Sequence, residues 1–488
     1  MRATAGSGPV IRELNVPPQV LRRLAARAPE RYPILLDSAA DGPLSRASIL
    51  FAEPRAALWL DSDGRLGAEG TTVEGPDFLT ALENWWLAER DVGSAGVAVH
   101  GASAIHSDTA TGGGTGLREL AGFNGGWAVF LSYEMAREIE PKLYLPRAKL
   151  PWQAFALRAP CAVIHERASG RVYAIAEPES AAALNRIEAD ARQAATQAEP
   201  LSELQRVEAV FEEEPAKYLH RVARAKEYVR AGDIYQANLS RPWRVQFAGE
   251  PDIAALYNRL CRANPAPFAA LAQWRGARIL SSSPERLLRV QGRQVDTRPI
   301  AGTRPRSLRP GVDLAEMKEL AAHPKERAEH IMLIDLERND LGRVCRAGTV
   351  RVDELMTIES YAHVHHIVSN VTGELRADVT PIGALRAVFP GGTITGCPKF
   401  RCMQIIAELE GTGRGAYTGS LGFLGRDGTM DMNILIRTMT VVDGGVELRA
   451  GGGIVADSDP QRELEETRAK ARGMLAAFDI SQAAGAVA

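Results

Sequence analysis

Two short turns in the C-terminal half restrict the fold of this chain more than any other feature. Residues 425–428 (Gly-Arg-Asp-Gly) and 443–445 (Asp-Gly-Gly) each lie between apolar runs. Glycine and aspartate in such short connections favour β-hairpins, in which neighbouring strands pair antiparallel. Hairpins of this kind predict an α+β fold rather than a doubly wound α/β fold.

Hydrophobic periodicity predicts further elements along the chain. Strands are expected at residues 33–37, 48–52, 128–133, 234–247, 365–371, 417–423, 433–441 and 446–450, and helices at 181–198, 218–231 and 398–409 and from about 324 and 460. An acidic, proline-containing stretch near 200–215 marks a boundary. We therefore divide the chain into an N-terminal region, 1–205, and a C-terminal region, 206–488, and expect the two to pack as one unit.

Charge and cysteine usage exclude several classes of protein. The 488 residues include 58 basic and 60 acidic side chains, a net charge of −2, which does not favour binding to nucleic acid or to an anionic membrane. The five cysteines are scattered without C-x-x-C spacing, which argues against a disulfide framework or a structural zinc site. Because no apolar run approaches a membrane span, we expect a soluble, cytoplasmic protein.

Three segments could bind an anion. Residues 296–306 carry three arginines around a rigid Pro-Ile-Ala-Gly-Thr path, and guanidinium groups suit a planar carboxylate. Residues 391–399 lack the P-loop pattern but run into a predicted helix start, where backbone amides attract anions. The glycines at 451–453 would let a ligand approach the backbone. A solvated basic turn is the simpler interpretation of the first segment, and tight turns explain the other two equally well.

Two predicted helices carry clustered ionisable residues. Each cluster occupies one helix face: Glu326, Glu329 and His330 lie at positions i, i+3 and i+4 of the first helix, and Glu463, Glu466 and Lys470 at i, i+3 and i+7 of the second. Solvated faces with internal pairing are the simpler interpretation. The alternative is that one carboxylate from each helix holds a hard cation such as Mg²⁺, which takes one or two protein carboxylates.

Two other positions could take part in proton transfer. His365 and His366 lie in an apolar strand, so their imidazoles point to opposite faces and at most one faces a site. Glu285 follows a predicted strand and could act as a general acid if its surroundings raise its pKa. An ordinary salt bridge explains Glu285 equally well.

Taken together, these segments resemble the chorismate-utilising enzymes. The resemblance runs from about residue 218 to residue 475 with the motifs in the family's order: 232–239 (Gly-Asp-Ile-Tyr-Gln-Ala-Asn-Leu), 283–285 (Ser-Pro-Glu), 297–303 (Thr-Arg-Pro-Ile-Ala-Gly-Thr), 326–330 (Glu-Arg-Ala-Glu-His), 335–340 (Asp-Leu-Glu-Arg-Asn-Asp), 364–369, 392–399, 436–438 (Ile-Arg-Thr), 451–458, and Glu466-Thr467 with Lys470. The N-terminal region matches less well, best at 35–38 and 125–134.

The resemblance implies a fold, a cofactor and a set of site residues. The fold would be α+β, with two packed, mainly antiparallel sheets, surrounding helices and a chorismate-binding cleft in the catalytic region, 206–488. Glu329 and Glu466 would bind magnesium, and Glu285, His366 and Lys470 would transfer protons or position the substrate. Chorismate would contact Gly302, Thr303, Thr393, Tyr417, Arg437, Gly451, Gly452 and Gly453, and an effector site would include Ser38, Pro265, Ala266 and Pro267.

The choice within the family depends on two positions. The isochorismate and salicylate synthases resemble this chain but carry a water-activating lysine where it has Gln236, so ammonia is favoured over water as the nucleophile. Many aminodeoxychorismate synthases carry a lysine at position 301, whereas anthranilate synthases have alanine, as here. Residues 394–396 (Ile-Thr-Gly), the paired histidines and residues 264–268 (Asn-Pro-Ala-Pro-Phe) nevertheless resemble the aminodeoxychorismate branch, which we favour.

The source of ammonia follows from what the chain lacks. No Gly-x-Cys-x-Gly pattern surrounds any cysteine, so we expect a separate glutamine amidotransferase subunit as partner. An anthranilate synthase component I remains the alternative. A chorismate-binding regulatory subunit without chemistry is a more distant one.

Overall fold

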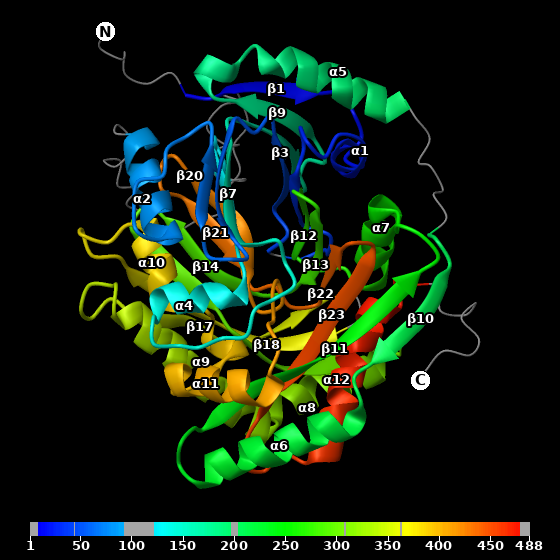
Figure 1. Cartoon of the computed structure of the whole chain (residues 1–488), viewed down its shortest axis with the longest axis vertical. Helices are drawn as coiled ribbons and strands as arrows, with labels where there is room; N and C mark the ends of the chain where they lie inside the picture. Colours follow the sequence, from blue (N-terminus) through cyan, green and yellow to red (C-terminus); the bar gives the residue numbers. More distant parts are fainter. Residues whose placement is uncertain are drawn as a thin grey trace.

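The computed structural model describes residues 8–42, 44–91, 122–196, 204–306, 309–361 and 364–478. Over these ranges the chain forms two large β-sheets, of 12 and 11 strands, with helices around them (Figure 1). Every pairing between the described strands that is part of these sheets is antiparallel. The predicted α+β class with two mainly antiparallel sheets is confirmed.

The first sheet takes strands from both regions of the chain. Its order is β1 (Val10–Leu14), β9 (Val172–Ala176), β8 (Cys161–Glu166), β3 (Ala47–Ala52), β2 (Ile34–Asp37), β12 (Phe268–Trp274), β13 (Ala277–Ser283), β22 (Thr438–Val442), β23 (Gly445–Ile454), β11 (Gln236–Phe247) and β10 (Val207–Glu212), and β19 (Gly396–Cys397) pairs with β11. The regions 1–205 and 206–488 therefore meet inside this sheet, where β2 pairs with β12.

The second sheet mixes the two regions in the same way. Its order is β16 (Ile300–Pro305), β18 (Val364–Glu374), β15 (Gln294–Arg298), β14 (Arg286–Gln291), β21 (Met430–Asn433), β20 (Ser420–Gly425), β6 (Gly126–Leu131), β7 (Trp152–Ala159), β4 (Ala56–Asp61) and β5 (Leu66–Glu69), and β17 (Arg351–Ser360) pairs with β18. Here β6 pairs with β20 across the sequence boundary.

A shared apolar core holds the two sheets together. It contains Ile34, Phe51 and Ile279 from the first sheet and Phe130, Phe155 and Leu421 from the second, all less than 6% exposed. Phe130 stacks on Phe155 with ring centroids 5.3 Å apart, and Trp274 lies 4.9 Å from Phe155. Aromatic packing of this kind adds specific ring geometry to the burial of large apolar surfaces.

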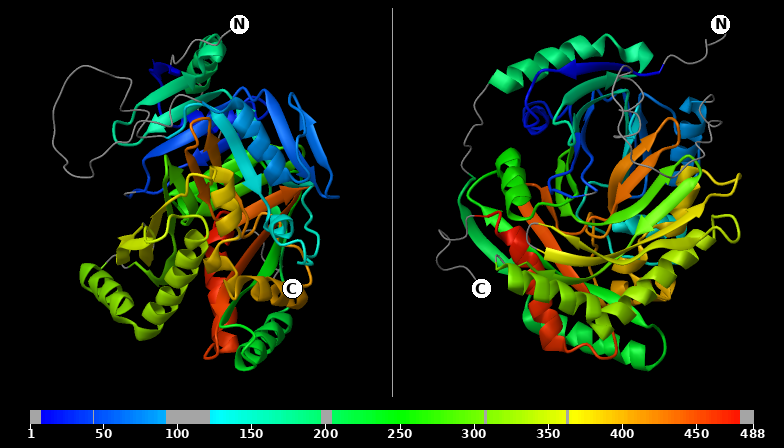
Figure 2. Two further views of the ribbon diagram at one scale, coloured as in Figure 1. Left: turned by 90° about the vertical axis from the view of Figure 1, so that its left-hand side faces the viewer. Right: turned by 180° about the vertical axis from the view of Figure 1, so that it is seen from behind.

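Helices cover the remaining faces (Figure 2). Three of them, α1 (Val20–Arg27), α5 (Ala183–Thr196) and α7 (Ile253–Ala263), share the apolar cluster of the first sheet. Beside β11 and β23 lie α6 (Pro215–Arg230), α11 (Lys399–Glu410) and α12 (Pro460–Leu475). The second sheet contacts α2 (Phe78–Glu89), α8 (Pro310–Ala322), α9 (Pro324–Gly342) and α10 (Pro381–Val388). None of the helices within these ranges is long and apolar enough to span a lipid bilayer.

The predicted hairpins are present, but one predicted strand is wrong. Residues 425–428 connect β20 to β21, and 443–445 connect β22 to β23. The expected single strand at 433–441 is instead two strands: β21 ends at Asn433 in the second sheet, and β22 begins at Thr438 in the first. Between them Arg437 has a φ of 51°, a left-handed conformation that interrupts an extended strand.

Two predicted starting points also shift. The strand expected from 417 begins at Ser420, since Thr418 has a φ of 63°. The helix expected at 398 begins at Lys399, with Pro398 as its N-cap. All five cysteines fall in described ranges and are free thiols, as predicted.

Candidate active site

Two crossings between the sheets bring Glu285 and Arg437 together. Glu285 lies where the chain leaves β13 of the first sheet for β14 of the second, and Arg437 lies where it returns from β21 to β22. The crossings are joined by backbone hydrogen bonds, from Ile434 N to the Glu285 carbonyl (3.0 Å) and from Ser282 N to the Arg437 carbonyl (3.1 Å). A buried acid and a half-buried cation therefore lie at one position between the sheets.

Burial gives Glu285 the pKa of a general acid. Its side chain is 4% exposed, and loss of solvent raises its pKa to about 7. The Thr393 hydroxyl, the Ile300 amide and the positive charges of Arg437 and Lys470 oppose part of this rise. One carboxyl oxygen, Oε1, has no hydrogen-bond partner within the described part of the chain. Glu285 is thus partly protonated at neutral pH and able to donate a proton.

Arg437 is a half-buried cation in the same place. Burial lowers its pKa to about 10, while Glu285 and Tyr361 raise it. The guanidinium therefore stays charged at neutral pH. A planar, charged fork inside the protein suits a carboxylate ligand.

The three glycines predicted to admit a ligand lie inside a strand. Gly451, Gly452 and Gly453 extend β23 and pair with β11, so the alternative of a tight turn is wrong. A Cβ atom at Gly453 would lie 2.2 Å from Gln236 Nε2. At Gly452 it would lie 3.3 Å from Glu463 Oε2 and 3.7 Å from Glu466 Oε1. Glycine is needed here because side chains from other elements reach the backbone.

Helix α12 supplies a charged wall beside these glycines. Lys470 Nζ donates to the Gly451 carbonyl at 2.8 Å and pairs with Glu466 Oε1 at 2.8 Å. Partial loss of hydration lowers the pKa of Lys470, but Glu466, Tyr417 and Glu463 together raise it above its ordinary value. The Lys470 and Glu466 side chains keep 43% and 52% of their exposure, so this wall is open to solvent.

The two histidines make different contacts, as strand alternation predicts. His365 bonds to Ser360 Oγ through Nδ1 (2.7 Å) and to Asp313 through Nε2 (3.0 Å). The pKa of His366 is lowered to about 3 by burial and by the charge of Arg437, so its imidazole is neutral. Gly302, whose backbone hydrogen-bonds with His366, has a φ of 73°, and a Cβ there would lie 2.9 Å from a carboxyl oxygen of Glu326.

The remaining predicted substrate contacts lie around this centre. Tyr417 is buried, the Arg414 guanidinium lies 5.7 Å from its ring centroid, and burial raises its pKa. The Thr393 hydroxyl lies beside Glu285. The backbone of Thr303 pairs with His366, and its side chain lies outside the described residues.

The predicted magnesium ligands lie on two different helices. Glu329 is half-buried on α9, which packs against β16 and β18, and Glu466 is on α12 against β23. The described residues hold no group of three or more metal-binding side chains close enough for one ion. Magnesium needs only one or two protein carboxylates, and Gly452 leaves space beside Glu463 and Glu466. The donor set therefore fits a hard cation, and the pairing of Glu329 with Glu466 stays a prediction.

The residues of the predicted effector site lie together. Ser38 Oγ donates to the Ala47 carbonyl (2.8 Å) and to the Pro267 carbonyl (3.4 Å). The amides of residues 39 and 40 both donate to the Ala266 carbonyl. Segments 38–40 and 265–267 thus form one buried corner where β2 meets β12, and an effector role for it stays a prediction.

Sequence reasoning gave no role to Glu337, a buried acid near Glu285, although the residue lies in the 335–340 motif. It lies on α9 with 3% exposure, near Thr297 and within electrostatic range of Glu285. The signal was helical spacing, because the buried residues His330, Ile334 and Leu341 place Glu337 on the same inward face of α9.

With this geometry in place, comparison with known proteins decides the family. A family model described as chorismate binding enzyme matches residues 96–476. The chain belongs to this chorismate-binding enzyme family. Anthranilate synthase component 1 of Thermus thermophilus is 39% identical over 480 residues, which cover 96% of this chain and 97% of that protein.

Other members of the chorismate-binding enzyme family agree with this assignment. Aminodeoxychorismate synthase component 1 of Bacillus subtilis is 46% identical over 261 residues, 54% of this chain and 55% of that protein. This chain therefore spans about half the length of several curated relatives in their alignments. The crystal structure of anthranilate synthase component I from Streptococcus pneumoniae superposes with a TM-score of 0.72 at 28% identity, covering 89% of this chain and 93% of that one.

Proposed function

We propose that this protein is component I of an aminodeoxychorismate synthase, which converts chorismate and ammonia to 4-amino-4-deoxychorismate. The observation that supports it most is the buried Glu285, with a pKa of about 7, beside the half-buried cation Arg437. Chorismate is a dianion with a poor hydroxyl leaving group. Its amination needs both a proton for that hydroxyl and fixed positive charge.

Each residue would have a defined task in the amination. Arg437 and the amides of Gly451–Gly453 would bind the carboxylates, and Glu285 would protonate the C4 hydroxyl as the C–O bond breaks. Lys470 and the neutral His366 would orient the ring. Magnesium bound by Glu329 and Glu466 would offset the charge of the ring carboxylate. Gln236, beside Gly453, has no basic nitrogen to activate water, which favours ammonia as the nucleophile.

Anthranilate synthase component I is the second candidate. Ala301 favours it, because a methyl group cannot form the ring adduct of lysine-bearing aminodeoxychorismate synthases. Relatives named anthranilate synthase component 1 also favour it. Residues 394–396 and the paired histidines favour the first candidate. In either case we propose a glutamine amidotransferase subunit as the source of ammonia, and a cytoplasmic location.

The first prediction separates these candidates by product. Purified protein with chorismate, magnesium and ammonium at raised pH, where more free NH₃ is present, should form 4-amino-4-deoxychorismate, detected by liquid chromatography. A lyase would then convert this product to 4-aminobenzoate. Anthranilate with stoichiometric pyruvate would favour the second candidate, and no turnover would favour a regulatory subunit.

Glutamine should not replace ammonium as the nitrogen source, and glutamine-driven turnover by the isolated chain would contradict the need for a partner.

The second prediction concerns the metal. Glu466→Gln keeps the shape of the side chain but removes the anionic oxygen that a hard cation prefers. The variant should need roughly tenfold or more magnesium for half-maximal turnover, because magnesium sites use only one or two protein carboxylates. Glu465→Gln, an exposed neighbour on α12, is the control and should keep the wild-type titration. If Glu466→Gln needs no more magnesium than the wild type, Glu466 is not a metal ligand and is an ordinary solvated partner of Lys470.

A further inference from the structure

A second buried carboxyl lies behind Glu285. Glu337 of α9 faces the 3₁₀ helix η3 (Gly392–Ile394), where a Cβ at Gly392 would lie 3.3 Å from Glu337 Oε1. The next residue, Thr393, lies beside Glu285. Two consecutive residues of one short helix therefore lie beside the two carboxyl groups.

A threonine hydroxyl lies beside each of the two carboxyls. In the described part of the chain, four buried oxygens make no hydrogen bond of good geometry: Glu285 Oε1, Thr297 Oγ1, Glu337 Oε2 and Thr393 Oγ1. Thr393 lies beside Glu285 and Thr297 beside Glu337, so each carboxyl has a hydroxyl near it that is not held in a well-formed bond. Hydroxyls and a protonated carboxyl both donate and accept, which is what a path for a proton needs.

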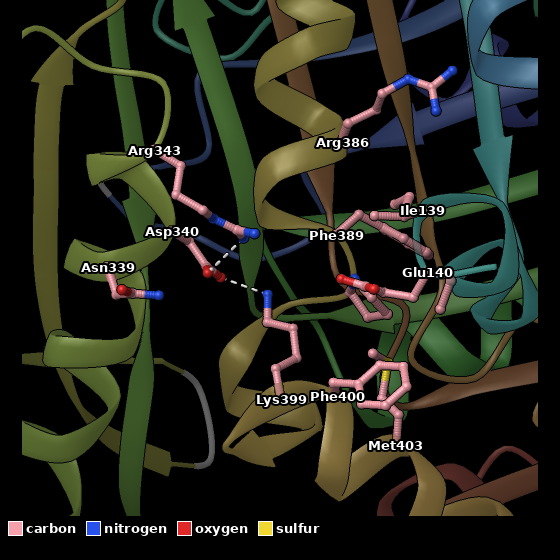
Figure 3. A pocket seen from close by; sticks show the side chains of 12 residues that line it. Ile139, Glu140, Asn339, Asp340, Arg343, Arg386, Phe389, Lys399, Phe400 and Met403 are labelled. Atoms are coloured by element: carbon pink, nitrogen blue, oxygen red, sulfur yellow. Dashed lines mark hydrogen bonds and ion pairs between the residues drawn. The ribbon is translucent and has the colours of Figure 1, made fainter. Parts of the chain in front are cut away.

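A cavity lies next to Asp340 on the same helix as Glu337 (Figure 3). Asp340, one turn further along α9, accepts from Lys399 Nζ at 2.5 Å and from Arg343 Nη2 at 2.8 Å. Asp340, Arg343 and Lys399 line a cavity of about 200 Å³ together with Phe389, Phe400 and Met403. Figure 3 shows Asp340 between Lys399 and Arg343. The Arg343 side chain is 51% exposed, so ionisable groups extend from solvent toward Glu337.

The proposed amination consumes one proton per turnover. The nitrogen lone pair of ammonia forms the new C–N bond, the C–O bond breaks, and the hydroxyl leaves as water with the proton of Glu285. The aminated product carries its nitrogen as an ammonium group at neutral pH. Glu285 is left as a carboxylate, and a proton from solvent must restore it before the next turnover.

We propose that Glu337 stores this proton and transfers it to Glu285 past the hydroxyls of Thr297 and Thr393. Glu337 is then reprotonated from solvent by way of Asp340 and the cavity beside it. The inference rests on the amination proposed above. Burial, and then the charge of Asp340, raise the pKa of Glu337 to about 8; Lys399 lowers it and Glu285 raises it. Glu337 therefore keeps its proton at the pH where Glu285 is half ionised, near 7.

The test compares Glu337→Gln with Asp335→Asn in the full-length chain. Asp335 is two residues away on α9, 62% exposed and paired with Arg338, so it is the matched control. Infrared difference spectra across about pH 6 to 9 should show a protonated-carboxyl band that disappears near pH 8 in the control and is missing in Glu337→Gln. With ammonium as nitrogen source, Glu337→Gln should lower kcat about tenfold at unchanged KM for chorismate, a modest share of general acid–base catalysis.

A third variant separates proton storage from packing. Glu337→Asp keeps a titratable group and should be faster than Glu337→Gln, although it fits the site less well. Wild-type turnover by Glu337→Gln, a slower rate for Asp than for Gln, or an ionised Glu337 at pH 6 would each overturn the proposal. If the wild-type protein fails to aminate chorismate, the proposed function fails, while the infrared titration still reports whether Glu337 holds a proton.

Discussion

Glu285→Gln is expected to lower the rate of chorismate amination by about 10²- to 10⁴-fold, the range of a lost general acid. Glutamine has nearly the same shape, so the crossing between β13 and β14 should persist, but an amide cannot give its proton to a leaving hydroxyl. The kcat with ammonium is the measurement. Glu69→Gln, 72% exposed at the far edge of the second sheet, is the control and should keep wild-type activity. A loss below threefold for Glu285→Gln would contradict its role as the acid.

The pH dependence of the amination rate is a second test of Glu285 as the acid. Because the pKa of folded Glu285 is raised to about 7, the acid is present below this pH, and at a fixed concentration of free NH₃ the wild-type rate should fall as the pH rises past it. The residual rate of Glu285→Gln should lack this fall. The free energy of unfolding also depends on the protonation of Glu285, whose pKa in the unfolded chain is about 4.3. Between that pH and 7 the folded state binds the extra proton, so wild-type stability should decline relative to Glu285→Gln as the pH rises.

Much of the architecture could be predicted from local patterns. Glycine-aspartate turns specify hairpins regardless of what surrounds them, which is why the α+β class and the β20–β21 and β22–β23 pairs were correct. The division of 433–441 between two sheets was not predictable in this way. It depends on Arg437 adopting a left-handed conformation that its neighbours, not its own preference, stabilise.

The site shows the same limit. Local sequence patterns singled out Glu285 and Lys470 as candidates, and the resemblance to the chorismate-utilising enzymes added Arg437. It could not show that Gly451–Gly453 continue a strand, since glycine is weak in strands and common in turns. Glu337 was missed because a glutamate on a helix is usually solvated. Its burial arises only when α9, η3 and β15 come together, contacts between residues far apart in sequence.

The second large effect is a loss of stability, and it is expected at a cluster of buried ion pairs near Tyr417. Glu410, at the end of α11, is 1% exposed in its side chain and pairs with Arg414 (2.7 Å) and Arg449 (2.9 Å), which are 1% and 3% exposed. Its Oε1 also accepts from Ser240 N on β11 at 2.8 Å. One carboxylate therefore compensates two buried guanidinium groups and ties α11 to β11 and β23.

Glu410→Gln is expected to destabilise the fold by roughly 3–5 kcal/mol, because it leaves two buried cations without their counter-charge. Chemical denaturation at neutral pH measures this. Glu408→Gln, an exposed position on the same helix that accepts from Tyr228, is the control and should stay within about 0.5 kcal/mol of wild type.

The pKa of Glu410 is lowered, against the effect of burial, by Arg414 and Arg449. Its contribution is thus complete above the unfolded pKa of about 4.3 and is lost at lower pH. The two stability curves should therefore converge in acid, and a constant difference down to about pH 2 would show that packing rather than charge makes Glu410 important.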